Sequence, residues 1–370
     1  MSKFVCPFCL REYNKSEVLY WCSKCGKPVK KPAFGKIKCS CGGIASARKC
    51  KYSSCDAGSD GTDFIPKDAL EMPYLSFSIV GLSNSGKTNF ITVMLNELQH
   101  SSGLHLPAGP LNKDSKKKQS DNYELIYLKH DKPDATKPGS EKPQIWNVRN
   151  VAKRKGNTVP TYTFTIFDGA GESHQELDSS STECRYIAAS KAIIVTIDPL
   201  ALEGVKNGGF VDSRTINNSR PSQGNIGSDS LQSVDIVNGV ADYIKTAIGI
   251  KGTKRLTMPV ALVLTKFDTV LGHPAFGENA LVKHPSKVFV NGEYRETEAI
   301  QIDNEIKGWL TEIGEEAFID AVEANFSNYC FFGVSSYGSV PPSSQKTPDS
   351  IDPHRVLDPI LWLFHQVKFI

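Results

Sequence analysis

The sequence predicts an α/β protein, with a mostly parallel sheet covered by helices, preceded by a small cysteine-rich module. From Leu75 onward, short β-branched runs alternate with longer helical patterns, which is typical of a parallel sheet with helical crossovers. Eight of the ten cysteines lie in the first 55 of the 370 residues, and the composition changes near residue 60. We therefore expect a cysteine-rich module over 1–58, a connector over 59–71 and an α/β domain over 72–370.

The composition excludes several classes of protein. Hydrophobic residues make up 39% and charged residues 22% of the chain, which is typical of a globular protein. No run of about 18 apolar residues occurs, so no membrane-spanning helix is expected. The first residues, MSKFVCPFC, lack the apolar core of a signal peptide, and this favours a cytoplasmic location. The net charge of +3 does not by itself indicate a polyanionic partner.

The clustered cysteines of the first module indicate metal binding, because a cytoplasmic chain keeps its thiols reduced. Two C-x-x-C pairs can complete a tetrahedral site, and four thiolates in that geometry favour Zn²⁺. The simplest partition joins Cys6, Cys9, Cys22 and Cys25 in one zinc site and Cys39, Cys41, Cys50 and Cys55 in a second. Cross-bracing of the pairs is the alternative. We expect bound zinc to supply the folding energy of this zinc-ribbon-like module, whose core should be separate from that of the α/β domain.

The module is also basic, since residues 1–58 contain 12 lysines and arginines against three acids. This charge suits an acidic partner. The sequence favours docking to a partner protein first, nucleic-acid binding second and a purely structural cap third.

The secondary structure of the α/β domain follows from its apolar runs. Strands are expected at 75–81, 161–168, 191–198, 259–266 and 329–336, with a further edge strand at 145–151. Helices are expected after Gly86 and at 230–248, 296–313 and 358–367. Long polar stretches at 100–120, 203–229 and 272–295 interrupt this pattern, and loops of such length are usually functional or disordered.

Residues 81–88 read GLSNSGKT, the pattern G-x-x-x-x-G-K-[ST], between a strand and a helix. Gly81 and Gly86 let the backbone turn so that successive N–H groups face phosphate oxygens. Lys87, exposed in this loop, would reach the β- and γ-phosphates and assist their transfer, and Thr88 would hold Mg²⁺. The expected nucleotide contacts of this segment are Gly81, Asn84, Ser85, Gly86, Lys87, Thr88 and Asn89.

Three later segments also follow strands. Asp168 opens DGAGE and would hold the Mg²⁺ shell from the opposite side, while Gly171 would offer its N–H to a γ-phosphate. In TKFD, Asp268 can accept both ring donors of guanine, which adenine lacks, so this residue would select GTP over ATP. The stem of Lys266 can lie along the base. The remaining base contacts are expected from Thr265, Ser335 and Ser336, the serines through backbone N–H groups near the guanine O6.

These four motifs, in this order, resemble a P-loop GTPase of the translation-factor-related class over roughly 72–370. More narrowly, the N-terminal CPFC, the DGAGE motif and the C-terminal RVLDPILWLF resemble a bacterial double-GTPase family of multi-gene GTPase-associated systems. The resemblance implies the three-layer GTPase fold, binding of GTP and GDP, GTP hydrolysis and coupling to partner proteins.

The catalytic residues follow less directly. Many small GTPases carry Gln where this chain has Glu172, and the resemblance accepts Glu there to position water; His174 is the rival candidate. Turnover without a partner should be slow, and a non-hydrolysing GTP-binding scaffold is the alternative. Thr136 is our choice for the Mg²⁺-contacting threonine of the first switch, and Thr158, in the turn between two strands, is the runner-up.

Asn84 suggests a further cofactor. The loop G-x-x-N-x-G-K resembles that of potassium-activated GTPases, in which the asparagine helps to hold a monovalent cation beside the phosphates. A K⁺ ion there would offset negative charge that develops during transfer. A hydrogen bond within the loop is the alternative role for Asn84.

Overall fold

A seven-stranded sheet forms the centre of the computed structural model, which describes residues 3–30, 37–55, 57, 64–81, 85–133, 142–168, 182–219 and 233–370. The strand order is β14-β11-β10-β6-β9-β8-β7. Five strands are parallel: β6 (Tyr74–Gly81), β9 (Thr161–Asp168), β10 (Ala192–Ile197), β11 (Val260–Leu264) and β14 (Tyr329–Gly333). The antiparallel strands β8 (Gln144–Arg149) and β7 (Ala108–Pro110) extend one edge. The prediction of an α/β protein with a mostly parallel sheet is confirmed.

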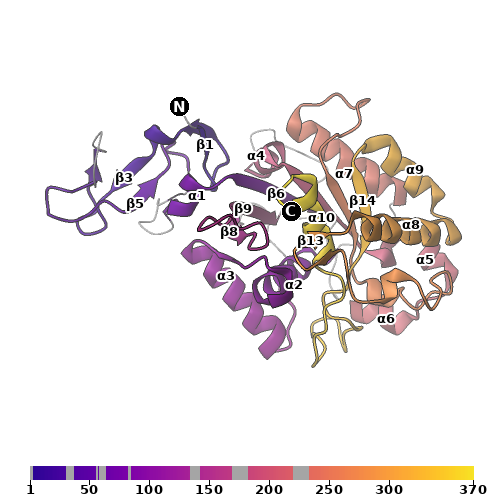
Figure 1. Cartoon of the computed structure of the whole chain (residues 1–370). Coiled ribbons are helices and arrows are strands. Elements are labelled where there is room, and N and C mark those ends of the chain that lie inside the picture. Colours follow the sequence, from indigo (N-terminus) through magenta and orange to yellow (C-terminus); the bar gives the residue numbers. More distant parts are fainter. Residues whose placement is uncertain are drawn as a thin grey trace.

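Both faces of the sheet are buried, and most of its parallel strands are apolar at successive positions. In β10, for example, Ile194 belongs to one hydrophobic cluster, whereas Ile193 and Val195 belong to the cluster on the other face. The first face is covered by α2 (Lys87–His100) and α10 (Asp358–Gln366), and the second by α4 (Thr182–Ala189), α7 (Ser233–Ile248) and α9 (Glu316–Asn325). Helix α8 (Glu296–Glu312) packs along β14 and contributes to both clusters (Figure 1).

Several elements lie in stretches that were expected to be loops. Helix α3 (Lys113–Tyr123) occupies the lysine-rich stretch, where the Asn112 side chain caps it by accepting from the Ser115 N–H, and it continues into a π-helical turn at Glu124–Leu128. The other elements in these stretches are β7, α5 (Glu203–Gly208), α6 (Ser213–Ser219), β12 (Phe289–Val290) and β13 (Glu293–Tyr294). Short 3₁₀ turns span Lys15–Glu17, Ser102–Leu104, Pro199–Ala201, Phe267–Thr269 and Leu281–Lys283. The expected edge strand at 145–151 is β8, one position inside the edge that β7 forms.

The cysteine-rich head projects from the α/β domain on the side of β8 and β9 (Figure 1). It contains a hairpin of β1 (Lys3–Val5) and β2 (Glu12–Asn14), and a sheet of β4 (Pro28–Val29), β3 (Leu19–Trp21) and β5 (Ala47–Lys49). Helix α1 (Lys67–Glu71), in the expected connector, packs its Ala69 against the head.

The hydrophobic cluster of the head also includes Ile145 of β8. The expectation of two separate cores is therefore wrong for this part of the head. Within the part of the chain that the structure describes, no helix combines the length and apolar character needed to cross a bilayer.

Candidate nucleotide site and cysteine centres

The segment that matches the phosphate-loop pattern lies at the carboxyl end of the central strand β6. Gly81 is the last residue of β6, and a Cβ atom there would lie only 2.2 Å from Thr196 Oγ1, so the position requires glycine. Gly86 has a φ of +76° and is the N-cap of α2. The loop therefore delivers the chain into a helix N-terminus, whose unpaired N–H groups and dipole favour an anion.

Lys87, the first residue of α2, turns back over this loop. Its Nζ donates a hydrogen bond of 2.8 Å to the Gly81 carbonyl, and only 7% of the residue is exposed. The expectation of an exposed lysine is wrong, because the ammonium group lies against the backbone of the loop. The Oγ of the buried Ser85 lies 2.8 Å from Thr196 Oγ1, which ties the loop to β10.

Thr88 and Asp168, the expected Mg²⁺ ligands, lie on neighbouring elements at this edge of the sheet. Thr88 is half-buried in the first turn of α2, and Asp168 ends β9. Asp168 pairs in register with Ile79, two residues before Gly81. A hydroxyl and a carboxylate are the hard oxygen ligands that Mg²⁺ prefers, so this donor set fits the ion. In the same turn, the buried Oδ1 of Asn89 has no hydrogen-bond partner among the described residues.

The segment that follows β11 lies directly beside the phosphate loop. Thr265 Oγ1 donates a hydrogen bond of 2.7 Å to the Ser85 carbonyl. The stem of Lys266 passes over the loop, because its Cε would lie 3.9 Å from a Cβ at Gly86. Its Nζ forms an ion pair of 2.7 Å with Asp198, at the end of β10. Two motifs about 180 residues apart in the sequence therefore meet at one edge of the sheet.

Asp268 lies in the wall of a cavity of 560 Å³ that Ser335 also lines. Ser335 Oγ donates a hydrogen bond of 2.6 Å to Asp268 Oδ1, and burial raises the pKa of this carboxyl group, against the effect of that hydrogen bond. The backbone N–H of Ser335 donates to the His354 carbonyl at 3.0 Å. This N–H group is therefore already paired within the chain, contrary to its expected contact with guanine. The Ser335 hydroxyl instead orients the Asp268 carboxylate. Ser336 is half-buried in the same turn.

Some expected site residues lie outside the described part of the chain: Asn84, Thr136, Gly171, Glu172 and the rival His174. Their roles remain predictions. The topology does, however, decide against Thr158. It lies exposed in the turn between β8 and β9, at the amino end of β9, whereas Asp168 marks the opposite end. By contrast, the strand after Thr136 starts at Gln144, opposite Ile166, near the edge that carries the phosphate loop.

Three residues near the site were missed by sequence reasoning. Thr196 and Asp198 lie at the end of the strand expected at 191–198. The other candidate motifs were found because they follow strands, and the same search at this strand would have found these two residues. Lys132 gave no such signal. Its Nζ donates to the carbonyls of Asn218 and Ser343 at 3.0 and 3.2 Å. Burial, with the nearby charge of Lys266, lowers the pKa of Lys132 to about 8.

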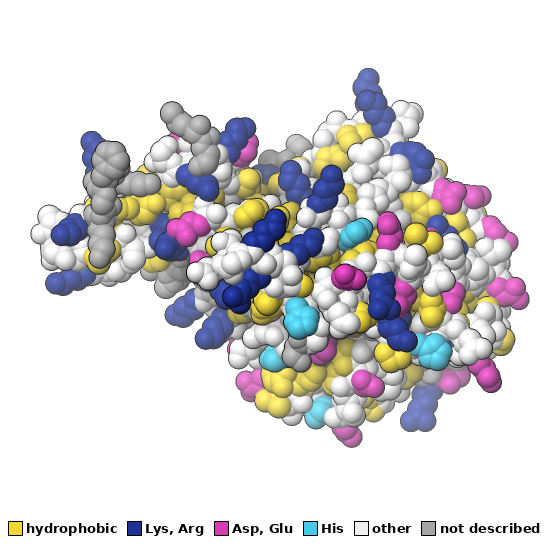
Figure 2. Space-filling model, viewed as in Figure 1, with side chains coloured by type: hydrophobic (Ala, Val, Ile, Leu, Met, Phe, Trp, Pro, Cys, Tyr) yellow, Lys and Arg dark blue, Asp and Glu magenta, His cyan; other side chains and the backbone are white. Residues whose placement is uncertain are grey.

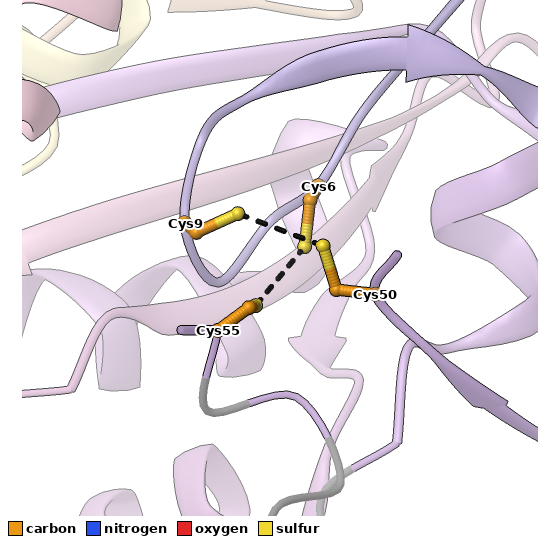
Figure 3. A group of neighbouring side chains, drawn as sticks. All are labelled: Cys6, Cys9, Cys50 and Cys55. Carbon is orange, nitrogen blue, oxygen red and sulfur yellow. Dashed lines mark hydrogen bonds between the residues drawn. The ribbon is translucent and has the colours of Figure 1, made fainter. Parts of the chain in front are cut away.

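The eight cysteines of the head form two groups of four. We name them by their order in the sequence: Cys6, Cys9, Cys50 and Cys55 form the outer centre, and Cys22, Cys25, Cys39 and Cys41, which lie between them along the chain, form the inner centre. In each group the sulfur atoms all lie within 4.8 Å of one another. The side chains of the outer centre converge on one point in Figure 3. Zn–S bonds of ~2.3 Å in a tetrahedron place sulfurs about 3.8 Å apart, so sulfur separations of 3.5–3.8 Å fit zinc.

The predicted partition of the cysteines is wrong, and so is cross-bracing. Strand β5 pairs antiparallel with β3, with Leu19 opposite Lys49. Cys50 therefore lies near the start of β3, beside the turn of the β1–β2 hairpin that carries Cys6 and Cys9. The segment between β3 and β5, at the other end of β3, contains all four cysteines of the inner centre. Along the sequence, the four cysteines of the inner centre therefore lie between the two pairs of the outer centre. The register of the short sheet determines this pairing, and the cysteine spacing does not.

Backbone N–H groups favour the thiolate form of two ligands of the inner centre. The Cys41 N–H lowers the pKa of Cys39 to about 6, and the Cys25 N–H lowers that of Cys22. The Gly43 N–H acts in the same direction on Cys41, but hydrogen bonds with the neighbouring thiols outweigh it and raise the pKa of Cys41 to about 12. Thiolates are the form that binds metal, so these knuckles suit a cation such as Zn²⁺.

We predict about two zinc ions per chain by elemental analysis. The double variant Cys6→Ser/Cys22→Ser removes a ligand from each centre and should lose both ions, whereas Cys22→Ser/Cys39→Ser should lose one. The sequential partition predicts the reverse. Ser23→Ala, an exposed neighbour of Cys22, is the control and should keep two ions. A zinc content near zero in the unmodified protein would contradict the metal assignment.

Comparison with known proteins gave little information. No family model matches the chain, and no curated protein matches it. Among solved structures, the chain is similar to a bacterial selenocysteine-specific elongation factor, EF-Sec, at 13% identity and a TM-score of 0.29. The match covers 80% of this chain but only 29% of that one. A TM-score this low carries no inference about fold or activity.

Proposed function

We propose that the protein is a GTP-binding and GTP-hydrolysing molecular switch, related to the P-loop GTPases of translation factors and coupled to partner proteins through its zinc-binding head. The hydrogen bond from Thr265 to the Ser85 carbonyl carries this proposal, because it places the TKFD segment directly beside the segment with the phosphate-loop pattern. Guanine would lie against the stem of Lys266, with its N1–H and 2-amino group donating to Asp268. Adenine lacks this pair of donors, so the site should discriminate against ATP.

Mg²⁺ held by Thr88 and Asp168 would neutralise phosphate charge. In this proposal Glu172 positions the attacking water and Thr136 contributes the first switch. Asn84 would help to bind K⁺. Lys87 would leave the Gly81 carbonyl for the β- and γ-phosphates, exchanging a neutral acceptor for charged ones.

Nucleotide profiling of the purified protein tests the proposal. GTP and GDP should raise its melting temperature in the presence of Mg²⁺, and ATP should not, because only guanine satisfies Asp268. Equal shifts with ATP and GTP would contradict guanine selection. Phosphate release in a single turnover then separates a hydrolase from a scaffold, because a scaffold binds GTP without releasing phosphate.

The charge of the head favours a second candidate partner, a nucleic acid. Residues 18–55 contain nine lysines and arginines and no acid. The Trp21 ring lies 4.9 Å from Lys49 Nζ, and a basic surface with an aromatic ring suits single strands. Lysine and arginine side chains flank hydrophobic ones along the head in Figure 2. Binding of a labelled single-stranded oligonucleotide that falls steeply with salt would support this candidate, and no binding at low salt would leave protein docking.

A further inference from the structure

The outer centre is packed against the α/β domain beside β9, the strand that ends at Asp168. Cys6 and Cys9 flank Phe8 in the knuckle CPFC, and the Phe8 carbonyl accepts a hydrogen bond from the hydroxyl of Tyr186 in α4. Tyr186 is only 3% exposed. The metal knuckle is thus joined by a buried hydrogen bond to a helix of the other part of the chain.

Tyr186 connects this knuckle to β9. Its ring is stacked on that of Phe167, with centroids 4.2 Å apart and planes 10° from parallel. Leu10, which follows the knuckle with a φ of +56°, completes this small cluster. Phe167 immediately precedes Asp168, and Asp168 pairs with Ile79 just before the phosphate loop. The contacts therefore lead from the cysteine knuckle to Phe167, the residue that precedes the expected Mg²⁺ ligand.

A second contact holds the same centre to the sheet. Cys6, Cys50 and Cys55 belong to one buried cluster with Ile145 of β8, the strand next to β9. Neither of the two clusters that join the head to the sheet contains a cysteine of the inner centre. The two centres should therefore differ in their effect on the nucleotide site.

We propose that Tyr186 is a positioning residue for nucleotide binding, through which metal in the outer centre fixes the end of β9 and hence Asp168. This inference rests on the proposed function, since it requires a nucleotide with Mg²⁺ at the phosphate loop. Loss of metal from the outer centre would release the knuckle and the Phe8 carbonyl. The affinity for Mg²⁺–nucleotide would then fall, whereas loss of metal from the inner centre would leave it unchanged.

Fluorescent GDP titrated with and without added Mg²⁺ tests the proposal on the full chain. Tyr186→Phe keeps the ring stack and removes only the hydroxyl, so the dissociation constant with Mg²⁺ should rise, by at most about five-fold, the full effect of one hydrogen bond. The dissociation constant without Mg²⁺ should not change, because in this proposal Asp168 acts on the nucleotide through that ion. A general loss of stability would weaken binding in both buffers. Tyr294→Phe, which removes a buried hydroxyl with no partner among the described residues, is the matched control.

Cysteine variants complete the test. Cys6→Ser/Cys9→Ser should weaken Mg²⁺–GDP binding at least as much as Tyr186→Phe, and Cys22→Ser/Cys25→Ser should have no effect. Unchanged Mg²⁺–GDP affinity in Tyr186→Phe, with two zinc ions retained, would overturn the inference even if the cysteine variants fail to fold. Failure of the unmodified protein to bind GDP would instead contradict the proposed function, so the two failures are distinguishable.

Discussion

Lys87→Ala will abolish tight binding of GTP. The lysine provides the one charged side chain that the phosphate-loop pattern directs at the β- and γ-phosphates, and charge-assisted hydrogen bonds of this kind contribute about 2–3 kcal/mol. We therefore expect the dissociation constant for GTP, measured by titration calorimetry, to rise by about 30- to 150-fold. Phosphate release should fall with it.

The fold of the Lys87→Ala variant should survive. In the structure the ammonium group contacts the Gly81 carbonyl at the end of β6, and neither Lys87 nor Gly81 belongs to a hydrophobic cluster of the sheet. Lys117→Ala, at an exposed position of α3, is the control and should bind GTP normally. Undiminished hydrolysis in Lys87→Ala would show that the phosphate loop has been assigned wrongly.

Asp268→Asn will lower the affinity for GTP by a similar factor and admit xanthine nucleotides. Guanine offers two donors to the carboxylate, and an amide accepts only one of them, so one charge-assisted pair is lost at about 2–3 kcal/mol. Xanthine carries an acceptor where guanine has its 2-amino group, and this acceptor matches the amide N–H. Competition of GTP and xanthosine triphosphate for the fluorescent GDP site measures the change.

The control for this variant is Asp235→Asn, at an exposed position of α7, which should keep the selectivity for guanine. The Ser335 hydroxyl, 2.6 Å from Asp268 Oδ1, can rotate to accept from an amide, so the turn should keep its conformation. Selectivity that survives Asp268→Asn would assign base recognition to other residues.

The central sheet was predictable because its parallel strands are buried on both faces. Most of them read as apolar runs such as AIIVTI in β10, which stand out from their surroundings, whereas β9 alternates threonine with apolar residues. The strand β7 was missed because Ala108–Pro110 is short and has no apolar run. The hairpin of β12 and β13 did have a signal. Asn291 and Gly292 both have positive φ, at +54° and +84°, and Asn-Gly between strands is typical of such a turn.

The candidate nucleotide site was predictable where its residues are contiguous in sequence. Lys87 and Asp268 each lie in a short motif at the end of a strand, and parallel strands bring such ends to one edge of the sheet. The contacts of the head with the domain were not predictable. Leu10, Phe167 and Tyr186 come from three distant segments, and no periodicity relates them.

The position of both cysteine centres within the first 55 residues has a consequence for the order in which the parts of the protein fold. All eight cysteines have been synthesised once Cys55 is added, and Tyr186 follows 131 residues later. Domains generally fold as units, the N-terminal one first during synthesis, so the head has time to take up metal before its docking partner exists. The finished outer centre then presents the Phe8 carbonyl and Leu10 as a preformed surface. Strand β9 and helix α4 would assemble against it as they emerge, so the head acts as a template for the domain that follows it.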